Sequence, residues 1–352
     1  MQITLVDEND YRNQMRTKVL PALAACRDEG WFEPPAAKGL GPAPTSGPLH
    51  YVCYDAARFD AIKVAGADAT FRGAIVISHG FTEFAAKYAE MIWYFLLAGY
   101  SVCLLEHRGH GRSVRDVKDR SLVWIDDWRR YVSDLAAFAG SIGQQYAGGS
   151  PLNLYAHSMG GGIGAAVLEQ YPSLFDRAVL SAPMIAPATG MPNWAARVLA
   201  EGLCALGMGR HVVFGQGPFD PDALDMAEYE GASEARIRWF HELRCEDAHR
   251  QTNAATFEWV RQALRLSHAV GRPQACANVE TPILLFQAAR DVWVLNQPQD
   301  RFASLVRDGG CDVELVHVPN ALHELFSMPN AVLRPYLDRI LDFLDDPVTA
   351  AL

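Results

Sequence analysis

The chain has 352 residues, of which 50% are hydrophobic and 20% are charged, and its formal net charge at pH 7 is −10. This composition is typical of a globular protein with enough apolar material for a core, and the length predicts two domains or one large domain with an insertion. The acidic balance and the absence of a Lys/Arg-rich run exclude a general nucleic-acid partner, because binding of phosphates needs clustered cations.

The cysteines and the N-terminal residues indicate the compartment. The seven cysteines are an odd number without a Cys-x-x-Cys pair, which is typical of reduced thiols. Residues 1–8 lack the basic start and apolar run of a signal peptide, and no later stretch is apolar for long enough to span a bilayer. We therefore expect a cytoplasmic protein, with peripheral contact at a membrane surface left open.

Residues 1–48 are expected to form an N-terminal helical arm and linker outside the core. Apolar residues recur at helical spacing over residues 8–26, and a Gly/Pro-rich linker follows over residues 30–48. Strands are predicted over residues 50–54 and 61–64.

The run over residues 73–78 is apolar and β-branched, which predicts a strand buried on both faces. It ends in His79-Gly80-Phe81 before a helix, so the Phe81 N–H can point back over the sheet as half of an oxyanion hole. The alternative is a plain turn in which Gly80 only supplies backbone freedom.

The next predicted strand, over residues 100–105, leaves through the loop 106–113. The two glycines of this loop match neither a P-loop nor a dinucleotide-binding fingerprint, so the loop is interpreted as a structural turn. Residues 128–142 carry an apolar stripe at helical spacing and lead to the following strand.

The stretch over residues 152–162 predicts a strand, a sharp turn with Ser158 at its tip, and a helix. Ala156 and Gly160 are small, as needed where a strand and a helix pass closely beside a nucleophile elbow. In this geometry the N–H of Met159 is the second half of the oxyanion hole. The alternative is an ordinary strand-to-helix loop.

Up to residue 183 strands and helices alternate, which predicts an open, mainly parallel sheet with helices on both faces. Residues 184–278 are predicted to be helical, and the strand pattern returns at residue 281. The sequence therefore predicts a core formed by residues 49–183 and 279–352, with residues 184–278 inserted as a helical cap.

Aromatic residues of the cap are suitable material for an acyl-chain pocket. We expect Trp194 and Trp259, together with His157 beside the elbow, to contribute to substrate binding. His241, Cys245 and His249 stand one helical turn apart, but the pattern is not His-Glu-x-x-His. No metal and no cofactor are predicted.

Two residues near the C-terminus complete a catalytic set with Ser158. Asp291 follows the predicted strand over residues 281–287, and His323 lies in a loop after the final strand. The order Ser158, Asp291, His323 is the order of the triad in an α/β-hydrolase fold. His317 lies inside the final strand and is interpreted as structural.

The sequence also resembles the monoacylglycerol lipase and bacterial lysophospholipase family of serine hydrolases over residues 72–345. The motifs that carry the resemblance are His79-Gly80-Phe81, Lys87-Tyr88-Ala89-Glu90, the loop 106–113, Ala156-His157-Ser158-Met159-Gly160-Gly161, Ser181-Ala182-Pro183-Met184 and Thr256-Phe257-Glu258-Trp259-Val260. Ala in place of Gly before His157-Ser158, with the Lys-Tyr-Ala-Glu run, favours the lysophospholipase branch.

The resemblance implies that Ser158 is the nucleophile, His323 the base and Asp291 the acid, with Phe81 and Met159 donating to the oxyanion. It implies a serine esterase that cleaves single-acyl lipid esters, either lysophospholipids or monoacylglycerols. The run Ala288-Ala289-Arg290-Asp291 departs from the family's Gly-x-x-Asp. Head group, chain length and oligomeric state are left open.

Two other classes of function are compatible with the same residues. One is a carboxylesterase, thioesterase or lactonase acting on small acyl compounds with the same triad. The other is a hydrolase-like ligand-binding protein with incidental turnover. A dehalogenase is disfavoured because Ser, and not Asp, stands at the elbow.

Overall fold

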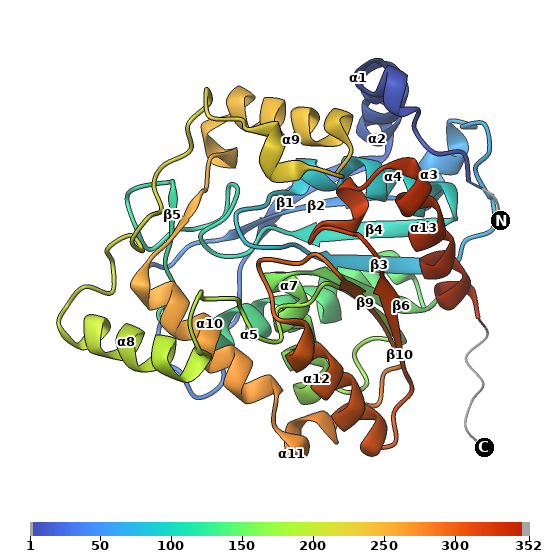
Figure 1. Cartoon of the computed structure of the whole chain (residues 1–352). Coiled ribbons are helices and arrows are strands. Elements are labelled where there is room, and N and C mark those ends of the chain that lie inside the picture. Colours follow the sequence, from blue (N-terminus) through green and yellow to red (C-terminus); the bar gives the residue numbers. More distant parts are fainter. Residues whose placement is uncertain (1–2, 347–352) are drawn as a thin grey trace.

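The computed structural model describes residues 3–346, and its centre is an eight-stranded sheet (Figure 1). The strands lie in the order β1-β2-β4-β3-β6-β7-β9-β10. Their bounds are β1 Arg27–Phe32, β2 Leu49–Tyr54, β3 Gly73–Ser78, β4 Tyr100–Leu105, β6 Leu152–His157, β7 Arg177–Ser181, β9 Ile283–Ala288 and β10 Val313–Val318. Strand β2 is antiparallel to β1 and to β4, and all other pairs are parallel. The carboxyl ends of β3, β4, β6, β7, β9 and β10 therefore meet at one edge of the sheet, where ligands bind in such folds.

Helices cover both faces of this sheet (Figure 1). Helices α4 and α13 and the N-terminal helices pack on one face, and α5, α7 and α12 on the other. The bounds of the helices are α1 Tyr11–Gln14, α2 Leu20–Cys26, α3 Ala56–Ala61, α4 Ala89–Leu97, α5 Arg129–Phe138, α6 Gln144–Ala147, α7 Met159–Gln170, α8 Asn193–Ala205, α9 Glu234–Glu246, α10 Phe257–Val270, α11 Pro273–Cys276, α12 Asn296–Asp308 and α13 Asn330–Asp345. The fold is an α/β-hydrolase fold, as the sequence predicts.

The fully buried strands were the most predictable elements. Every residue of β3, β4, β6, β7 and β9 is buried, because helices cover the sheet on both sides. The predicted helix over residues 8–26 is also present, as a continuous run of short 3₁₀, α and π segments.

The sheet begins earlier than the predicted core boundary at residue 49. Strand β1 takes up part of the predicted arm and linker and pairs antiparallel with β2, with Arg27 opposite Tyr54 and Phe32 opposite Leu49. Its residues Arg-Asp-Glu-Gly-Trp-Phe are partly exposed at the edge of the sheet, so they lack the apolar run that indicates a buried strand.

The predicted strand over residues 61–64 is wrong, because this region follows a short helix. The side chain of Asp55 accepts hydrogen bonds from the N–H groups of Ala57 and Arg58, and this cap starts α3. The helix ends at Ala61, and Lys63 adopts a φ of +53° in the following turn.

The region over residues 184–278 contains α8 to α11 and one two-residue strand. This strand, β8 (Ala254–Ala255), pairs in parallel with β5 (Leu122–Val123), which belongs to the loop after β4. The later part of the region is packed into the core, where Leu266, Val270 and Cys276 are buried. Within residues 3–346, no helix is both long and apolar enough to cross a bilayer.

A carboxyl group is buried between α7 and α11. Glu169 is 6% exposed, and its side chain has one hydrogen-bond partner within residues 3–346, the Cys276 thiol, with Sγ 3.8 Å from Oε1. Burial raises the pKa of Glu169 from 4.5 to about 8. The folded protein therefore keeps this group protonated at a pH at which the unfolded chain ionises it.

We expect Glu169→Gln to stabilise the protein, and to do so more at pH 8 than at pH 5. The pKa is raised on folding, so wild-type stability is lost as pH rises from about 4.5 towards 8, and the glutamine variant avoids this loss. The gain is on the order of 2 to 4 kcal/mol at pH 8. Thermal melts at both pH values measure it, with the exposed Glu280→Gln as control, and a gain of equal size at both pH values would contradict the prediction.

Candidate active site

Ser158 stands at a strained turn between β6 and α7. Its φ is +53° and its ψ is −119°, a region that non-glycine residues rarely occupy. A Cβ on Gly160 would lie 2.1 Å from the carbonyl oxygen of Ser78 on β3, so this position has room only for glycine. The turn is the nucleophile elbow that the sequence predicts, and it raises the Ser158 hydroxyl above the carboxyl edge of the sheet.

His323 and Asp291 form a hydrogen-bonded chain with Ser158. The Nε2 atom of His323 lies 2.7 Å from Ser158 Oγ, and its Nδ1 lies 2.6 Å from Asp291 Oδ2. The Asp291 side chain is fully buried and that of His323 is 11% exposed. In this arrangement the imidazole can accept the hydroxyl proton while the carboxylate fixes its orientation.

The loop that carries Asp291 forms without the glycine that the family resemblance leads us to expect at residue 288. The Asp291 Oδ1 atom accepts hydrogen bonds from the N–H groups of Trp293 and Val294, and Arg290 N–H donates to the carbonyl of Ala321. Ala288, which stands at the glycine position, has no left-handed φ. The substitution therefore leaves the acid facing His323.

The N–H groups of Phe81 and Met159 are the predicted donors to an oxyanion. Met159 is the first residue of α7, where N–H groups have no partner inside the helix. Phe81 follows β3, and within residues 3–346 neither its N–H nor that of Met159 donates a hydrogen bond. Glu83 accepts from the Gly80 N–H and fixes the loop that presents Phe81. These two donors are available for an oxyanion.

His157, predicted to contribute to substrate binding, is buried next to His323 and offers little surface to a ligand. The side chain is 1% exposed, with Nδ1 3.2 Å from the Ser181 carbonyl and its ring centroid 4.8 Å from that of His323. Burial lowers the pKa of His157 to about 4, so the ring is neutral. His157 is the last residue of the fully buried strand β6, which explains its burial, and its role in binding stays a prediction.

The two cap tryptophans lie in different places. Trp259 is 9% exposed and its ring centroid lies 4.1 Å from that of Phe81, in the loop after β3. Trp194 is 71% exposed and lines a cavity to which Ser158 and the other triad residues do not contribute. The structure thus brings Trp259 to the site, but it does not bring Trp194 there.

The histidines of the chance metal pattern have other partners, and His249 lies in a 3₁₀ turn after the end of α9. His241 Nε2 lies 2.8 Å from the Pro221 carbonyl, and His249 Nδ1 lies 2.9 Å from Asp247. Within residues 3–346, the side chains close enough to share one cation are Glu83, His157 and Glu324. The ammonium group of Lys87 already lies between the two carboxylates.

Lys87 links the loops of the site through buried ion pairs. Its Nζ lies 2.7 Å from Glu83 in the loop after β3 and 2.5 Å from Glu324, the neighbour of His323. Burial opposes the charge on Lys87, but Glu324 and Glu83 raise its pKa above the usual value. Burial likewise opposes the charge on Glu83, yet Lys87 and His157 hold its pKa well below the usual range. The charged pair is therefore maintained at neutral pH.

Sequence reasoning missed this buried network, although a signal was present. Glu83 and Lys87 are charged residues four positions apart beside an apolar helix, and Glu324 directly follows His323. Charges in such an apolar setting are paired in nearly all proteins. Which partners they find depends on how the loops meet, and one sequence does not give that.

We expect Lys87→Met to lower kcat/KM by up to about a hundredfold, because it leaves two buried carboxylates facing each other and displaces His323. Lys87→Arg keeps the charge and should restore most of the activity. The effect is measured as kcat/KM for ester hydrolysis. The temperature is one at which circular dichroism shows that both variants are folded. Equal activity of folded Lys87→Met and wild type would contradict it.

Together, the fold and the site define a serine hydrolase of the α/β-hydrolase class. Residues 69–330 match the model of the family described as serine aminopeptidase, S33, and the chain belongs to this family. Its resemblance to the monoacylglycerol lipases and bacterial lysophospholipases, drawn from the sequence motifs, is confirmed.

Curated relatives match most of the chain. It is 31% identical over 283 residues to lysophospholipase L2 of Escherichia coli strain K12, covering 77% of this chain and 80% of that protein. It is 28% identical over 279 residues to a probable lysophospholipase L2 of Haemophilus influenzae, covering 79% and 85%.

Among solved structures, a soluble variant of the monoglyceride lipase of Saccharomyces cerevisiae aligns with a TM-score of 0.66 at 19% identity, covering 91% of this chain and 95% of that one. A carboxyl esterase of Bacillus coagulans also has a TM-score of 0.66, at 15% identity and with coverage of 91% and 98%. At these identities the likeness shows the fold.

Proposed function

We propose that the protein hydrolyses the carboxylic ester of single-acyl lipids, either lysophospholipids or monoacylglycerols, to a fatty acid and an alcohol. The hydrogen-bonded chain Ser158, His323, Asp291 beside two free N–H groups is the observation that carries the proposal. The lysophospholipase relatives, which align over most of their length, support the choice of lipid esters.

In the proposed reaction, Ser158 Oγ attacks the ester carbonyl as its proton passes to His323 Nε2. The N–H groups of Phe81 and Met159 hold the oxyanion, and the alcohol leaves with the proton from His323. Water then attacks the acyl-enzyme with His323 as base and releases the fatty acid. Asp291 orients the imidazole and stabilises its protonated form.

We also propose that residues 184–278 act as a cap over this site. Trp259, packed on Phe81, supplies an apolar wall next to the oxyanion donors. Such a wall suits the acyl chain of the substrate.

The experiment compares oleate release from monoolein and from oleoyl lysophosphatidylcholine at equal concentration. Faster release from the lysophospholipid supports a leaving-group site that accepts a phospho head group, and faster release from monoolein supports a glycerol-sized one. If a soluble short-chain ester is hydrolysed while neither lipid is, the lipid assignment is wrong and a small-ester carboxylesterase replaces it.

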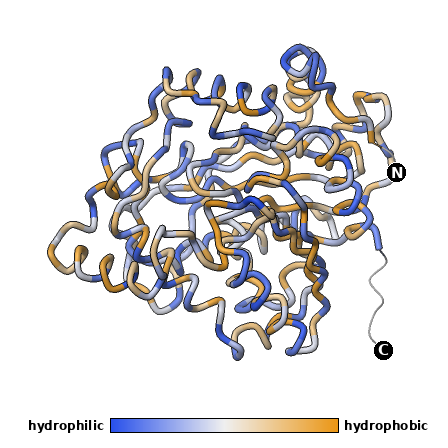
Figure 2. Tube along the Cα trace, viewed as in Figure 1, coloured by the Kyte–Doolittle hydropathy of each residue, from blue (hydrophilic) through white to orange (hydrophobic). Residues whose placement is uncertain are grey.

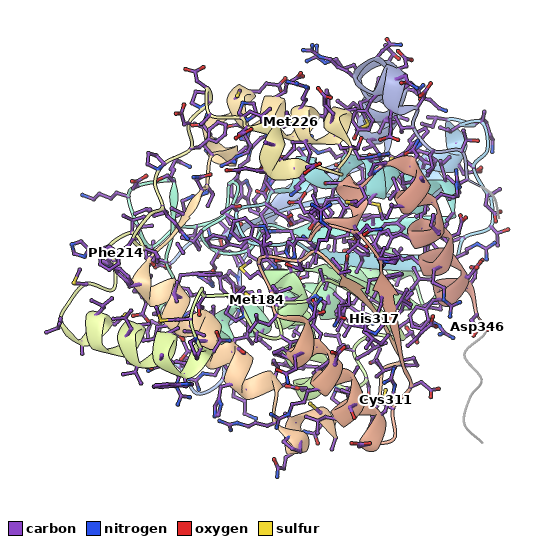
Figure 3. All side chains as sticks on the ribbon, in the orientation of Figure 1. Met184, Phe214, Met226, Cys311, His317 and Asp346 are labelled. Atoms are coloured by element: carbon purple, nitrogen blue, oxygen red, sulfur yellow. The ribbon has the colours of Figure 1, made fainter. Side chains whose placement is uncertain are left out.

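We further propose that α8 and the loop after it touch the lipid surface that holds the substrate. Large apolar side chains are exposed there by 47% to 79%, namely Trp194, Val198, Leu199, Leu206 and Phe214. Figure 2 shows apolar segments along this part of the chain, and Figure 3 places Phe214 at the outer edge of the molecule. Such side chains can insert into the boundary between head groups and acyl chains.

We expect the double variant Val198→Glu, Leu206→Glu to lower the rate on lysophospholipid in vesicles by about tenfold or more. Burial of one such side chain in lipid stabilises by about 1.5 to 3 kcal/mol, and 1.4 kcal/mol corresponds to a factor of ten. The rate on soluble p-nitrophenyl butyrate should stay unchanged. Ile62→Glu, an exposed apolar residue outside α8, is the control, and an equal loss on both substrates would contradict a surface role.

A further inference from the structure

A cavity lies away from the triad, lined by residues of α8, the end of α10, the start of α11 and α12. Figure 1 shows these four helices on the same side of the molecule. Its volume is about 610 Å³, which falls within the range of about 300 to 1,000 Å³ for small-molecule sites. Ser158, Asp291, His323, Phe81 and Met159 do not line it. The cavity is therefore separate from the proposed catalytic centre.

Three arginines from three elements line this cavity: Arg197 on α8, Arg272 at the N-cap of α11 and Arg301 on α12. Within residues 3–346, none of them forms an ion pair or donates a side-chain hydrogen bond, and no Asp or Glu is part of the lining. All three residues are exposed, so the cavity gathers three positive charges at the surface of a chain with a net charge of −10. They favour an anion there.

The carboxylates nearest along the chain are already engaged elsewhere. Glu201, one helical turn after Arg197, accepts from Arg261 and Arg265. Asp300, the neighbour of Arg301, accepts from the Gln287 side chain. Glu201 is thus paired with other cations, whereas the amide of Gln287 is neutral, so Asp300 offsets one of the three positive charges of the lining. The lining keeps a net positive charge.

The rest of the lining is largely apolar. Ile185, Leu264 and Phe302 form buried walls, and the exposed indole of Trp194 stands at the rim. Guanidinium groups next to aliphatic and aromatic walls match a ligand that has an anionic head and an apolar chain.

We propose that this cavity is a binding site for a single-chain anionic amphiphile, whose carboxylate or phosphate head is held by Arg197, Arg272 and Arg301 and whose chain lies on Trp194 and Leu264. A fatty acid, the product of the reaction proposed above, and a single-chain lipid phosphate both have this chemistry. The site itself does not depend on that reaction, because binding requires none of the triad residues.

The test measures binding to the full-length Ser158→Ala variant by isothermal titration calorimetry, below the micelle concentration of each probe. The probes are laurate, dodecyl phosphate, dodecanol and inorganic phosphate. A triple variant changes Arg197, Arg272 and Arg301 to Gln. The matched control changes Arg12, Arg238 and Arg339 to Gln. These exposed arginines lie on other elements, and their substitution removes the same number of positive charges.

We expect laurate and dodecyl phosphate to bind at least about tenfold more weakly to the triple variant and unchanged to the control, because charge-assisted hydrogen bonds to three guanidinium groups are lost. Dodecanol should bind weakly to all variants alike. The stronger of laurate and dodecyl phosphate identifies the head group. Arg301→Gln alone should show the same trend if the triple variant fails to fold.

The proposal would be overturned if laurate and dodecyl phosphate bound the Ser158→Ala protein equally well with and without the three arginine substitutions. It would also be overturned if neither probe bound at all. Inorganic phosphate that binds as tightly as dodecyl phosphate would also overturn it, because the site would then take a free anion. The readout is binding to the Ser158→Ala protein, so a failure of the proposed reaction would leave these outcomes unchanged.

Discussion

Ser158→Ala should lower the rate of oleate release from oleoyl lysophosphatidylcholine by up to about a million-fold, the loss seen when the nucleophile of a comparable triad is removed. The hydroxyl at the tip of the elbow has the bond to His323 that activation requires, with Oγ and Nε2 2.7 Å apart. No other hydroxyl group in residues 3–346 hydrogen-bonds to His323. The variant should keep only the rate enhancement that substrate binding and oxyanion stabilisation give without a nucleophile.

The variant should fold as well as the wild type, because the change removes one oxygen atom and keeps the strained backbone. Thermal melting by circular dichroism checks this point. Ser304→Ala, an exposed serine on α12, is the matched control and should keep full activity. A Ser158→Ala protein with more than about one hundredth of the wild-type rate would show that the nucleophile is another group.

Asp291→Asn should lower kcat by about 10⁴-fold, as the same change does in a serine protease triad. The asparagine can still accept from the N–H groups of Trp293 and Val294 through Oδ1, so the loop keeps its shape. Its amide would then point an N–H₂ donor at His323 Nδ1. The imidazole would then carry its proton on Nε2. A protonated Nε2 cannot accept the proton of the Ser158 hydroxyl.

Steady-state kinetics with a soluble ester measures the loss in kcat, and KM should change little because Asp291 does not touch the substrate. Asp308→Asn at the end of α12 serves as the matched control for the loss of one acidic charge. A fall of less than tenfold, in a protein that melts like wild type, would mean that a different acid orients His323.

The sequence predicted the parts of the fold that are governed by complete burial. The apolar runs of β3, β6 and β9 were recognised because strands covered on both faces have few polar residues. Strand β1 was missed for the opposite reason, since its exposed Arg, Asp and Glu give no buried pattern. Helix α3 was missed because its Asp55 cap, a local signal, was overlooked.

For the candidate site too, some features could be predicted from the sequence and others could not. Chain order and strand ends were sufficient to choose Ser158, Asp291 and His323, whose side chains the structure brings into one hydrogen-bonded chain, and their catalytic roles stay predictions. The burial of His157 and the place of Trp194 in another cavity depend on which way each side chain turns and on how the cap helices dock. Periodicity and spacing do not encode these.

Covalent labelling with a long-chain fluorophosphonate tests the central claim most directly. We expect one adduct per chain, located on Ser158 by peptide mapping, and a loss of oleate release from lysophosphatidylcholine in proportion to labelling. Retention of lipid hydrolysis in fully labelled protein, or labelling of another residue with Ser158 intact, would contradict an acyl-enzyme at this elbow.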